Sequence, residues 1–316
     1  MHCLAGFGLP ACVAYAIFVR STAAFGRPKA VYWPCALRRV QGKGESHPMI
    51  EARRVQLSLI ARLGDATLRL VGETGAMFLF FLESAGRIFM SWGQFHKIVR
   101  QVYFIGVKSI SVITLISLFT GMVIGLQMYY ALAKFGADGF LGAAVSLSLV
   151  RELGPVLTAI MITGRAGSSM TAEIGVMRIS EQVDALRVMD INPLGYLVSP
   201  KLAASVICFP ILTAFFDLVG MLGGYLTGVL LLGGNSGVYW YRVSAYLKMS
   251  DISGGFIKSL VFGLVVCTVC CYMGYFTHLR RDSVGPEAVS QATTSAVVTS
   301  CVLILVTDYL LTSLLF

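Results

Sequence analysis

Charged residues are scarce in this sequence. They make up 13% of its 316 residues, whereas hydrophobic residues make up 56%, and the mean hydropathy is +0.77. A soluble globular domain carries about 25% charged residues, so the composition excludes that class and predicts a protein that lies in a bilayer. The net charge is +9, but the basic residues lie mostly at the ends of apolar runs, which argues against a nucleic-acid partner.

The sequence also lacks the patterns of a nucleotide site, a metal site or a catalytic centre. It contains no G-x-x-x-x-G-K-[ST] motif for cradling ATP phosphates, and its four histidines are scattered without a nucleophile–base spacing. Cys267, Cys270 and Cys271 lie in an apolar run with no second cysteine pair or histidine at ligand spacing, so we expect them to pack as small hydrophobic residues. We therefore expect no catalytic residue, no metal and no cofactor in this chain.

The first part of the chain differs from the rest. Residues 1–48 are basic, with no acid before Glu45, and are either a targeting segment or the product of an upstream start codon, with Met49 as the natural beginning. Residues 49–102 are predicted to form amphipathic and interfacial helices, because apolar residues recur at helical spacing from Val55 and aromatic residues follow them.

Five later runs are long and apolar enough to cross about 30 Å of hydrocarbon. They lie at about 103–133, 140–164, 202–232, 254–277 and 292–316. The basic residues of the intervening 165–201 and 278–291 segments predict that both are cytoplasmic loops. We therefore predict an all-α membrane protein in which N-terminal interfacial amphipathic helices precede a five-span domain at 103–316. An odd number of spans places the N-terminal region in the cytoplasm and Phe316 outside.

Ionisable residues interrupt some of these runs. Arg151 and Glu152 lie near the middle of the second run, and a helix-breaking Gly-Pro pair follows them. Charge at membrane depth is tolerated only against protein or a water-filled cavity. Glu152 therefore either handles a substrate near a cavity or is a structural acid paired to a neighbouring helix. Asp217 and Asp308, also within spans, are expected to bond between helices.

A short amphipathic helix is predicted at about 180–190, between the second and third spans. Ser180 is a natural N-cap, apolar and charged residues alternate after it, and Pro193 follows the end. A helix exposed between two spans is suited to receive a push from a soluble motor. Arg165 and Glu173, upstream of it, are expected to be structural polar residues.

From about Gly86 to Phe316 the sequence resembles the MlaE-type permease family, the membrane subunits of ATP-binding-cassette (ABC) transporters that move lipids between bacterial membranes. The most specific stretch runs from Arg151-Glu152-Leu153-Gly154-Pro155 through Gly164-Arg165 and Glu173 to Glu181-Gln182-x-x-Ala185-Leu186. Further matches are Gly125-Leu126-Gln127 in the first span and Ala292-Thr293-Thr294 before the last. Several separated matches in the same order make the resemblance specific.

The resemblance implies a homodimeric, multi-pass permease in the bacterial inner membrane that carries a lipid, with phospholipid as the expected class, and maintains outer-membrane lipid asymmetry. ATP would be bound and hydrolysed by a separate ABC ATPase subunit. An MCE-domain lipid-binding protein and a small STAS-type regulatory subunit would complete the complex.

The resemblance also implies two sites. Leu126 and Tyr129 would line a lipid pocket between the protomers, although plain helix packing or an aromatic belt also explains Tyr129. Glu152 joins this lipid-pocket prediction as an ionisable residue at membrane depth. The ATPase would dock on the 180–190 helix, through Glu181, Gln182, Ala185 and Leu186. The remaining intramembrane polar residues would be structural, namely Arg151, Arg165, Glu173, Asp217 and Asp308.

Two other classes of function compete with a permease. A proton-coupled secondary transporter would use Glu152, Asp217 and Asp308 as a relay, but such carriers usually contain internal repeats, and the Arg-Glu-Leu-Gly-Pro break has no second copy. A membrane enzyme acting on lipids would need a nucleophile and a base at suitable spacing, and none stands out. A neighbouring reading frame with a G-x-x-x-x-G-K-[ST] motif would favour the permease.

Overall fold

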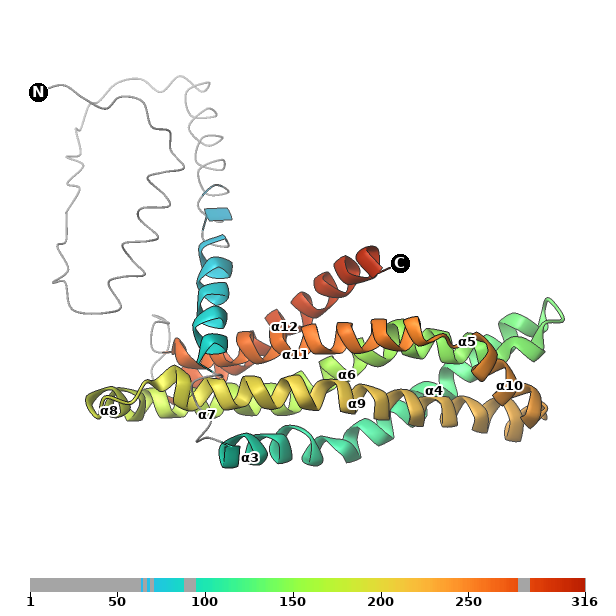
Figure 1. The fold of residues 1–316 in the computed structure, drawn as a ribbon, viewed down its shortest axis with the longest axis horizontal. Coiled ribbons are helices and arrows are strands. Elements are labelled where there is room, and N and C mark those ends of the chain that lie inside the picture. The colour runs from blue at the N-terminus through green and yellow to red at the C-terminus, as the bar shows by residue number, and fades with distance from the viewer. Residues whose placement is uncertain (1–63, 65–66, 69–70, 88–94, 278–284, 316) are drawn as a thin grey trace, which may run out of the picture. The chain divides into compact units, whose positions relative to one another are not determined.

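The computed structural model describes residues 64, 67–68, 71–87, 95–277 and 285–315, and within these the regular structure is helical, with no strand (Figure 1). Five helices in this part of the chain are long and apolar enough to cross a membrane. They are Phe95–Ala133, Asp138–Ile179, Leu194–Leu231, Met249–Tyr275 and Pro286–Leu315. The predicted all-α fold with five spanning helices is thereby confirmed. The predictions for residues 1–48 lie outside the described residues.

Most spans contain more than one helical element. The first comprises α3 (Phe95–Ile105), the 3-10 turn η2 (Val107–Ser109) and α4 (Ile110–Ala133). The second comprises η3 (Asp138–Phe140), α5 (Leu141–Ser148), the π-helical turn η4 (Leu149–Leu153), α6 (Gly154–Ile162), the π-helical turn η5 (Thr163–Gly167) and α7 (Ser168–Ile179). The third comprises η6 (Leu194–Val198), α9 (Ser199–Tyr225) and η7 (Leu226–Leu231), and α11 (Met249–Tyr275) and α12 (Pro286–Leu315) follow as single helices.

Two short helices connect consecutive spans. The second and third spans are joined through α8 (Gln182–Val188), and the third and fourth through α10 (Ser236–Tyr246). The two lie at opposite ends of the helix bundle (Figure 1). We refer to these ends as the α8 end and the α10 end.

The second span is longer than predicted, and the segment 165–201 is not a single loop. The predicted run stopped at charged residues. In the structure these residues lie on the helix, and their side chains bond to groups on neighbouring helices. The Arg165 guanidinium donates to the Phe104 carbonyl oxygen at 2.8 Å and to Ser109 Oγ at 2.7 Å. Glu173 forms an ion pair with Lys201, whose side chain is 2% exposed on α9. Hydropathy alone therefore underestimates the length of a helix whose charged residues are paired within the protein.

The first and third spans approach closely because glycines face each other. An ideal Cβ on Gly121 would lie 1.9 Å from the carbonyl oxygen of Gly220, and one on Gly223 would lie 2.3 Å from that of Leu118. Small residues at helix interfaces allow backbones to come this near in membranes, where dispersion contacts replace the hydrophobic effect as the driving force. Any side chain at these positions would force α4 and α9 apart.

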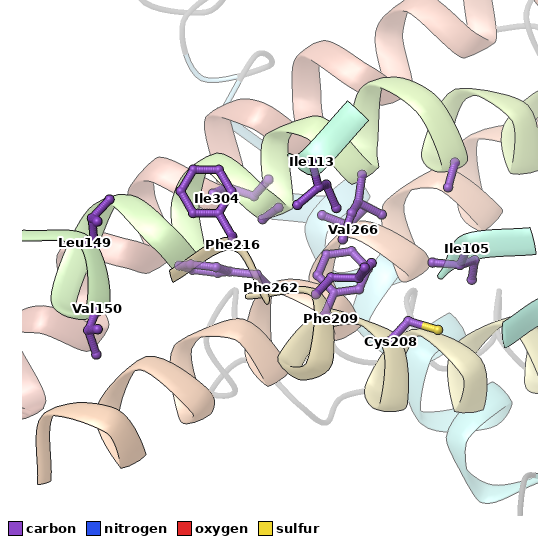
Figure 2. Close-up of a cluster of buried hydrophobic side chains, with 14 of the residues drawn as sticks. Ile105, Ile113, Leu149, Val150, Cys208, Phe209, Phe216, Phe262, Val266 and Ile304 are labelled. Carbon is purple, nitrogen blue, oxygen red and sulfur yellow. The ribbon is translucent and has the colours of Figure 1, made fainter. Parts of the chain in front are cut away.

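Large apolar side chains from several spans fill the centre of the bundle. Figure 2 shows Phe209 and Phe216 of α9 gathered with Phe262 and Val266 of α11, and all four are buried. Close packing of this kind fixes the spans laterally, so the polar groups between them have defined partners.

A second apolar cluster ties the N-terminal region to the spans. The helical segment 71–86 carries Phe80, which is buried against Tyr272, Tyr275 and Phe276. Phe78 on the same segment is 61% exposed. The segment predicted to lie at the membrane interface therefore also packs on α11 through one face.

Candidate functional site

A buried lysine that the sequence analysis overlooked organises the charged residues of the spans. Lys258, on α11, is fully buried. Its Nζ donates to the Arg151 carbonyl oxygen at 2.9 Å, to Glu152 Oε2 at 2.9 Å and to Thr312 Oγ1 at 2.7 Å. Asp308 Oδ1 lies 3.1 Å from the same nitrogen. One ammonium group thus joins the second, fourth and fifth spans.

The backbone around Arg151 offers Lys258 a carbonyl acceptor. Pro155, four residues on, has no N–H, so the Arg151 carbonyl oxygen lacks the usual helical donor. The N–H of Gly154 bonds to the carbonyl five residues back, which makes the π-helical turn η4. The Lys258 ammonium donates a hydrogen bond to this carbonyl oxygen from α11.

The helix α11 comes close to this turn because residue 255 is glycine. An ideal Cβ on Gly255 would lie only 2.7 Å from the Val150 carbonyl oxygen. Beside this contact Arg151 binds Asp251, with Nη2 2.8 Å and Nε 3.0 Å from Oδ1. Asp251 also accepts a hydrogen bond from the Lys248 backbone N–H at 3.2 Å. It therefore caps α11 and orients the arginine at the same time.

These groups form what we call the Lys258 cluster. Its ionisable members are Arg151, Glu152, Asp251, Lys258 and Asp308. With two cations and three anions the cluster has a formal charge of −1 when all members are ionised. A cavity of about 380 Å³ lies beside it, lined by Leu147, Ser148, Arg151, Glu152 and Thr312. Of the ionisable members of the cluster, Arg151 and Glu152 line this cavity.

The cluster lies between the middle of the second span and its α10 end. Glu152 is 14 residues from Asp138 and 27 from Ile179, the two ends of that span, which is about 21 Å and about 40 Å of helix at 1.5 Å per residue. The sequence had placed it near the middle, because the predicted run stopped before α7. Lys258 lies in the first half of α11 (Met249–Tyr275), which starts at the α10 end, so its position along the bundle agrees with that of Glu152.

The two aspartates predicted to bond between helices differ in their surroundings. Asp308 faces Lys258 across the fourth and fifth spans. Asp217 is 8% exposed and lies against α6, since an ideal Cβ on Gly154 would lie 1.9 Å from its Oδ1. Among the described residues no donor bonds to that oxygen. Asp217 Oδ1 is therefore closely packed against α6 and makes no interhelical hydrogen bond to a described residue.

The predicted lipid-pocket residues of the first span are not among the residues that line this cavity. Leu126 and Tyr129 are half-buried on α4. Tyr129 packs against the central apolar cluster, and its ring makes an edge contact with Tyr130 at 6.0 Å between centroids. Contact of these two residues with lipid stays a prediction.

The short helix at the α8 end forms close to where it was predicted, but its cap differs. The residue that precedes α8 is Glu181, in a left-handed conformation with φ of 58°. Ser180 instead continues the geometry of α7, because its N–H and its hydroxyl both bond to the Val176 carbonyl oxygen. The chain therefore turns sharply at Glu181 before α8 begins.

One face of α8 is fixed to the spans. Arg178 of α7 pairs with Asp184 at 2.7 Å, and Arg187 donates to the Tyr275 hydroxyl of α11 at 2.5 Å. Val183 on the same helix is fully buried in the second apolar cluster. Any displacement of α8 must therefore pull on α7 and α11.

The opposite face of α8 is exposed. Glu181, Gln182 and Ala185 are exposed there, whereas Leu186 is half-buried against the second apolar cluster. Val188 is 88% exposed. The residues predicted to contact an ATPase thus divide into three on the free face and one that anchors the helix.

The sequence analysis missed the ion-pair partners Lys258, Asp251 and Lys201. Lys258 could have been found, since it is a charged residue inside the predicted 254–277 run and such residues are functional candidates by default. Lys201 was counted with the 165–201 segment, and Asp251 lies just before the predicted 254–277 run. Among the described residues no group of histidine, cysteine or acidic side chains could hold a metal ion.

Comparison with known proteins agrees with the fold and the motifs. The family model described as Permease MlaE matches residues 98–314. A probable ABC transporter permease protein of Rickettsia bellii is 40% identical over 260 residues, which is 82% of this chain and 98% of that protein. The intermembrane phospholipid transport system permease protein MlaE of Haemophilus influenzae is 38% identical over 258 residues, 78% of this chain and 97% of that protein. The protein TRIGALACTOSYLDIACYLGLYCEROL 1, chloroplastic, of Arabidopsis thaliana is 35% identical over 218 residues, 69% of this chain and 61% of that protein. The chain therefore belongs to the MlaE permease family.

Proposed function

We propose that this protein is the membrane subunit of an ATP-driven lipid transporter whose ATP is hydrolysed by a separate ABC ATPase. The observation that carries the proposal is the free face of α8. This face lies outside the spans and exposes Val188 by 88% and Met189 by 61%. Apolar surface exposed to water suits a protein partner. The opposite face is tied to α7 and α11, so a push on α8 reaches the spans.

The ATPase would dock on this free face through Glu181, Gln182 and Ala185. Leu186 would hold α8 on the second apolar cluster while the partner moves it. The sequence contains no G-x-x-x-x-G-K-[ST] motif, which accords with ATP bound by another subunit. The α8 end is then cytoplasmic, as the basic residues predict.

The cargo would be a phospholipid, the class that the name of the Haemophilus influenzae relative specifies. It would enter a pocket formed by two copies of the chain, with Leu126 and Tyr129 contacting its apolar part and Glu152 its polar part. The exposed apolar residues along α12 offer surface for a second copy or for lipid, among them Val298, Val302, Leu305 and Tyr309. In a bacterial inner membrane, an MCE-domain protein and a STAS-type subunit would complete a complex that maintains outer-membrane lipid asymmetry.

Purification of the tagged chain in mild detergent tests the proposal. Mass spectrometry is expected to identify a co-purifying ABC ATPase and bound phospholipid. Ala185→Arg, which places a bulky charge on the free face of α8, should lose the ATPase while the chain stays in the membrane, and Ala185→Ser should retain it. If Ala185→Arg keeps both the ATPase and normal ATP-driven lipid transfer, the docking assignment is wrong.

A proton-coupled carrier is the second candidate. It is favoured by Glu152 and Asp308, two carboxylates that share the single ammonium of Lys258. Lipid transfer driven by a proton gradient without ATP would select this candidate.

A further inference from the structure

The cavity beside the Lys258 cluster displays one positive and one negative group. The side chains of Arg151 and Glu152 line it and are 39% and 40% exposed. The charges that balance them are hidden, since Lys258 is 0% and Asp251 is 2% exposed at the side chain. A molecule in the cavity therefore meets a guanidinium next to a carboxylate, although the cluster contains five ionisable groups.

Both displayed groups are oriented before any ligand arrives. Asp251 Oδ1 accepts a hydrogen bond from Arg151 Nε and lies 2.8 Å from Nη2, and these two contacts fix the plane of the guanidinium. Lys258 donates to Glu152 Oε2. A carboxylate has about four lone-pair sites, so Glu152 retains acceptor capacity toward the cavity. A planar guanidinium binds phosphate well, and a carboxylate binds an ammonium group well.

The charge of the cluster adds discrimination against anions. With a formal charge of −1 in total, it repels a ligand that brings a net negative charge into this depth of the membrane, where ionic interactions are stronger than in water. A zwitterionic ligand brings no net charge and carries a group for each displayed side chain.

On the basis of the transport function proposed above, we propose that this cavity selects zwitterionic phospholipid head groups over anionic ones. The lipid phosphate binds Arg151 and the head-group ammonium binds Glu152. Phosphatidylethanolamine carries both groups, whereas phosphatidylglycerol carries the phosphate alone and places its net charge near Glu152.

The purified complex in vesicles of equal parts phosphatidylethanolamine and phosphatidylglycerol tests this selection. After re-extraction, mass spectrometry measures the ratio of the two lipids bound to the protein. We expect about fivefold enrichment of phosphatidylethanolamine, the discrimination that one partly exposed charge contact supplies. Glu152→Gln, which removes the charge and keeps the shape, should bring the ratio close to that of the vesicles. Glu152→Asp should retain much of the enrichment.

Asp138→Asn is the matched control, because it removes one negative charge from an exposed residue at the α10 end outside the cavity lining. It should keep the wild-type ratio. A wild-type ratio equal to that of the vesicles would overturn the inference, as would unchanged enrichment in Glu152→Gln. Equal ATP-driven transfer of both lipids would refute the head-group selection alone. Absence of ATP-driven transfer of either lipid would instead refute the proposed transport function, and the binding ratio would still decide the selection.

Discussion

Replacement of Lys258 by methionine removes the charge on which the intramembrane cluster depends. Methionine is unbranched and flexible, so it fills most of the space of the lysine stem. The Arg151 carbonyl oxygen loses its donor, and Glu152 and Asp308 lose their shared cation. The substitution therefore isolates the electrostatic role of the residue.

The expected cost follows from burial. Breaking a buried ion pair by removing one partner costs about 3–5 kcal/mol, because the other charge stays buried and uncompensated. Glu152 is 40% exposed at the side chain, so water reaches one of the two carboxylates. We therefore expect Lys258→Met to lower the free energy of unfolding by about 2–3 kcal/mol. Adding Glu152→Gln and Asp308→Asn should restore the part of this loss that comes from the unpaired carboxylates, whereas the hydrogen bond to the Arg151 carbonyl oxygen stays lost.

Denaturant unfolding of the purified protein in detergent micelles measures these differences. Lys134→Met, at an exposed position after α4, is the control and should change the free energy of unfolding by less than about 0.5 kcal/mol. The reasoning is refuted if Lys258→Met is as stable as the wild type, or if the triple variant is less stable than Lys258→Met alone.

Three further predictions concern other parts of the chain. Gly255→Ala should lower the free energy of unfolding by about 1–3 kcal/mol, since its Cβ would meet the Val150 carbonyl oxygen at 2.7 Å. Gly254→Ala, whose Cβ would meet nothing within 4 Å, is the control and should be nearly neutral. Equal unfolding curves for the two variants would contradict the close approach. Tyr275→Phe removes the hydroxyl that accepts a hydrogen bond from Arg187. Amide hydrogen exchange in α8 should become faster, while the free energy of unfolding falls by no more than about 1.5 kcal/mol. Unchanged exchange would show that this bond does not hold α8. A chain starting at Met49 should insert and assemble like the full chain, and loss of membrane insertion would show that residues 1–48 are needed.

The spanning helices were largely predictable because apolar length is a local property. Hydropathy located all five, since each needs about 20 apolar residues whatever its neighbours are. It misplaced the end of the second span, where Arg165 and Glu173 lower the local hydropathy. Their contacts come from residues far along the chain, such as Lys201, and a local window cannot contain them.

The candidate site was predictable in residue type but not in pairing. Arg151 and Glu152 were recognised as costly intramembrane charges that need partners, and the family motif marked the same residues. Their partners, Asp251 and Lys258, lie about a hundred residues further along the chain. The contact depends on the packing of α11 against η4, which Gly255 permits. A contact between helices so far apart in the sequence cannot be predicted from local periodicity.

The exposed face of α8 was predictable in part. Amphipathic spacing located the helix, and in the structure Val183 is buried whereas Ala185 is exposed. The cap was wrong, because Ser180 bonds back into α7 and Glu181 makes the turn. Ser180 can serve either role, and the choice depends on how far α7 extends.

ATP-driven lipid transfer by the purified complex tests the central proposal most directly. The chain and its co-purified ATPase are reconstituted in vesicles, and movement of phospholipid to acceptor vesicles or an acceptor protein is followed with ATP, with a non-hydrolysable analogue, or with a proton gradient alone. We predict transfer with ATP, none above background with the analogue or the gradient, and loss of the ATP-driven part in Ala185→Arg. Transfer that is independent of ATP, or driven by the proton gradient alone, would contradict the account.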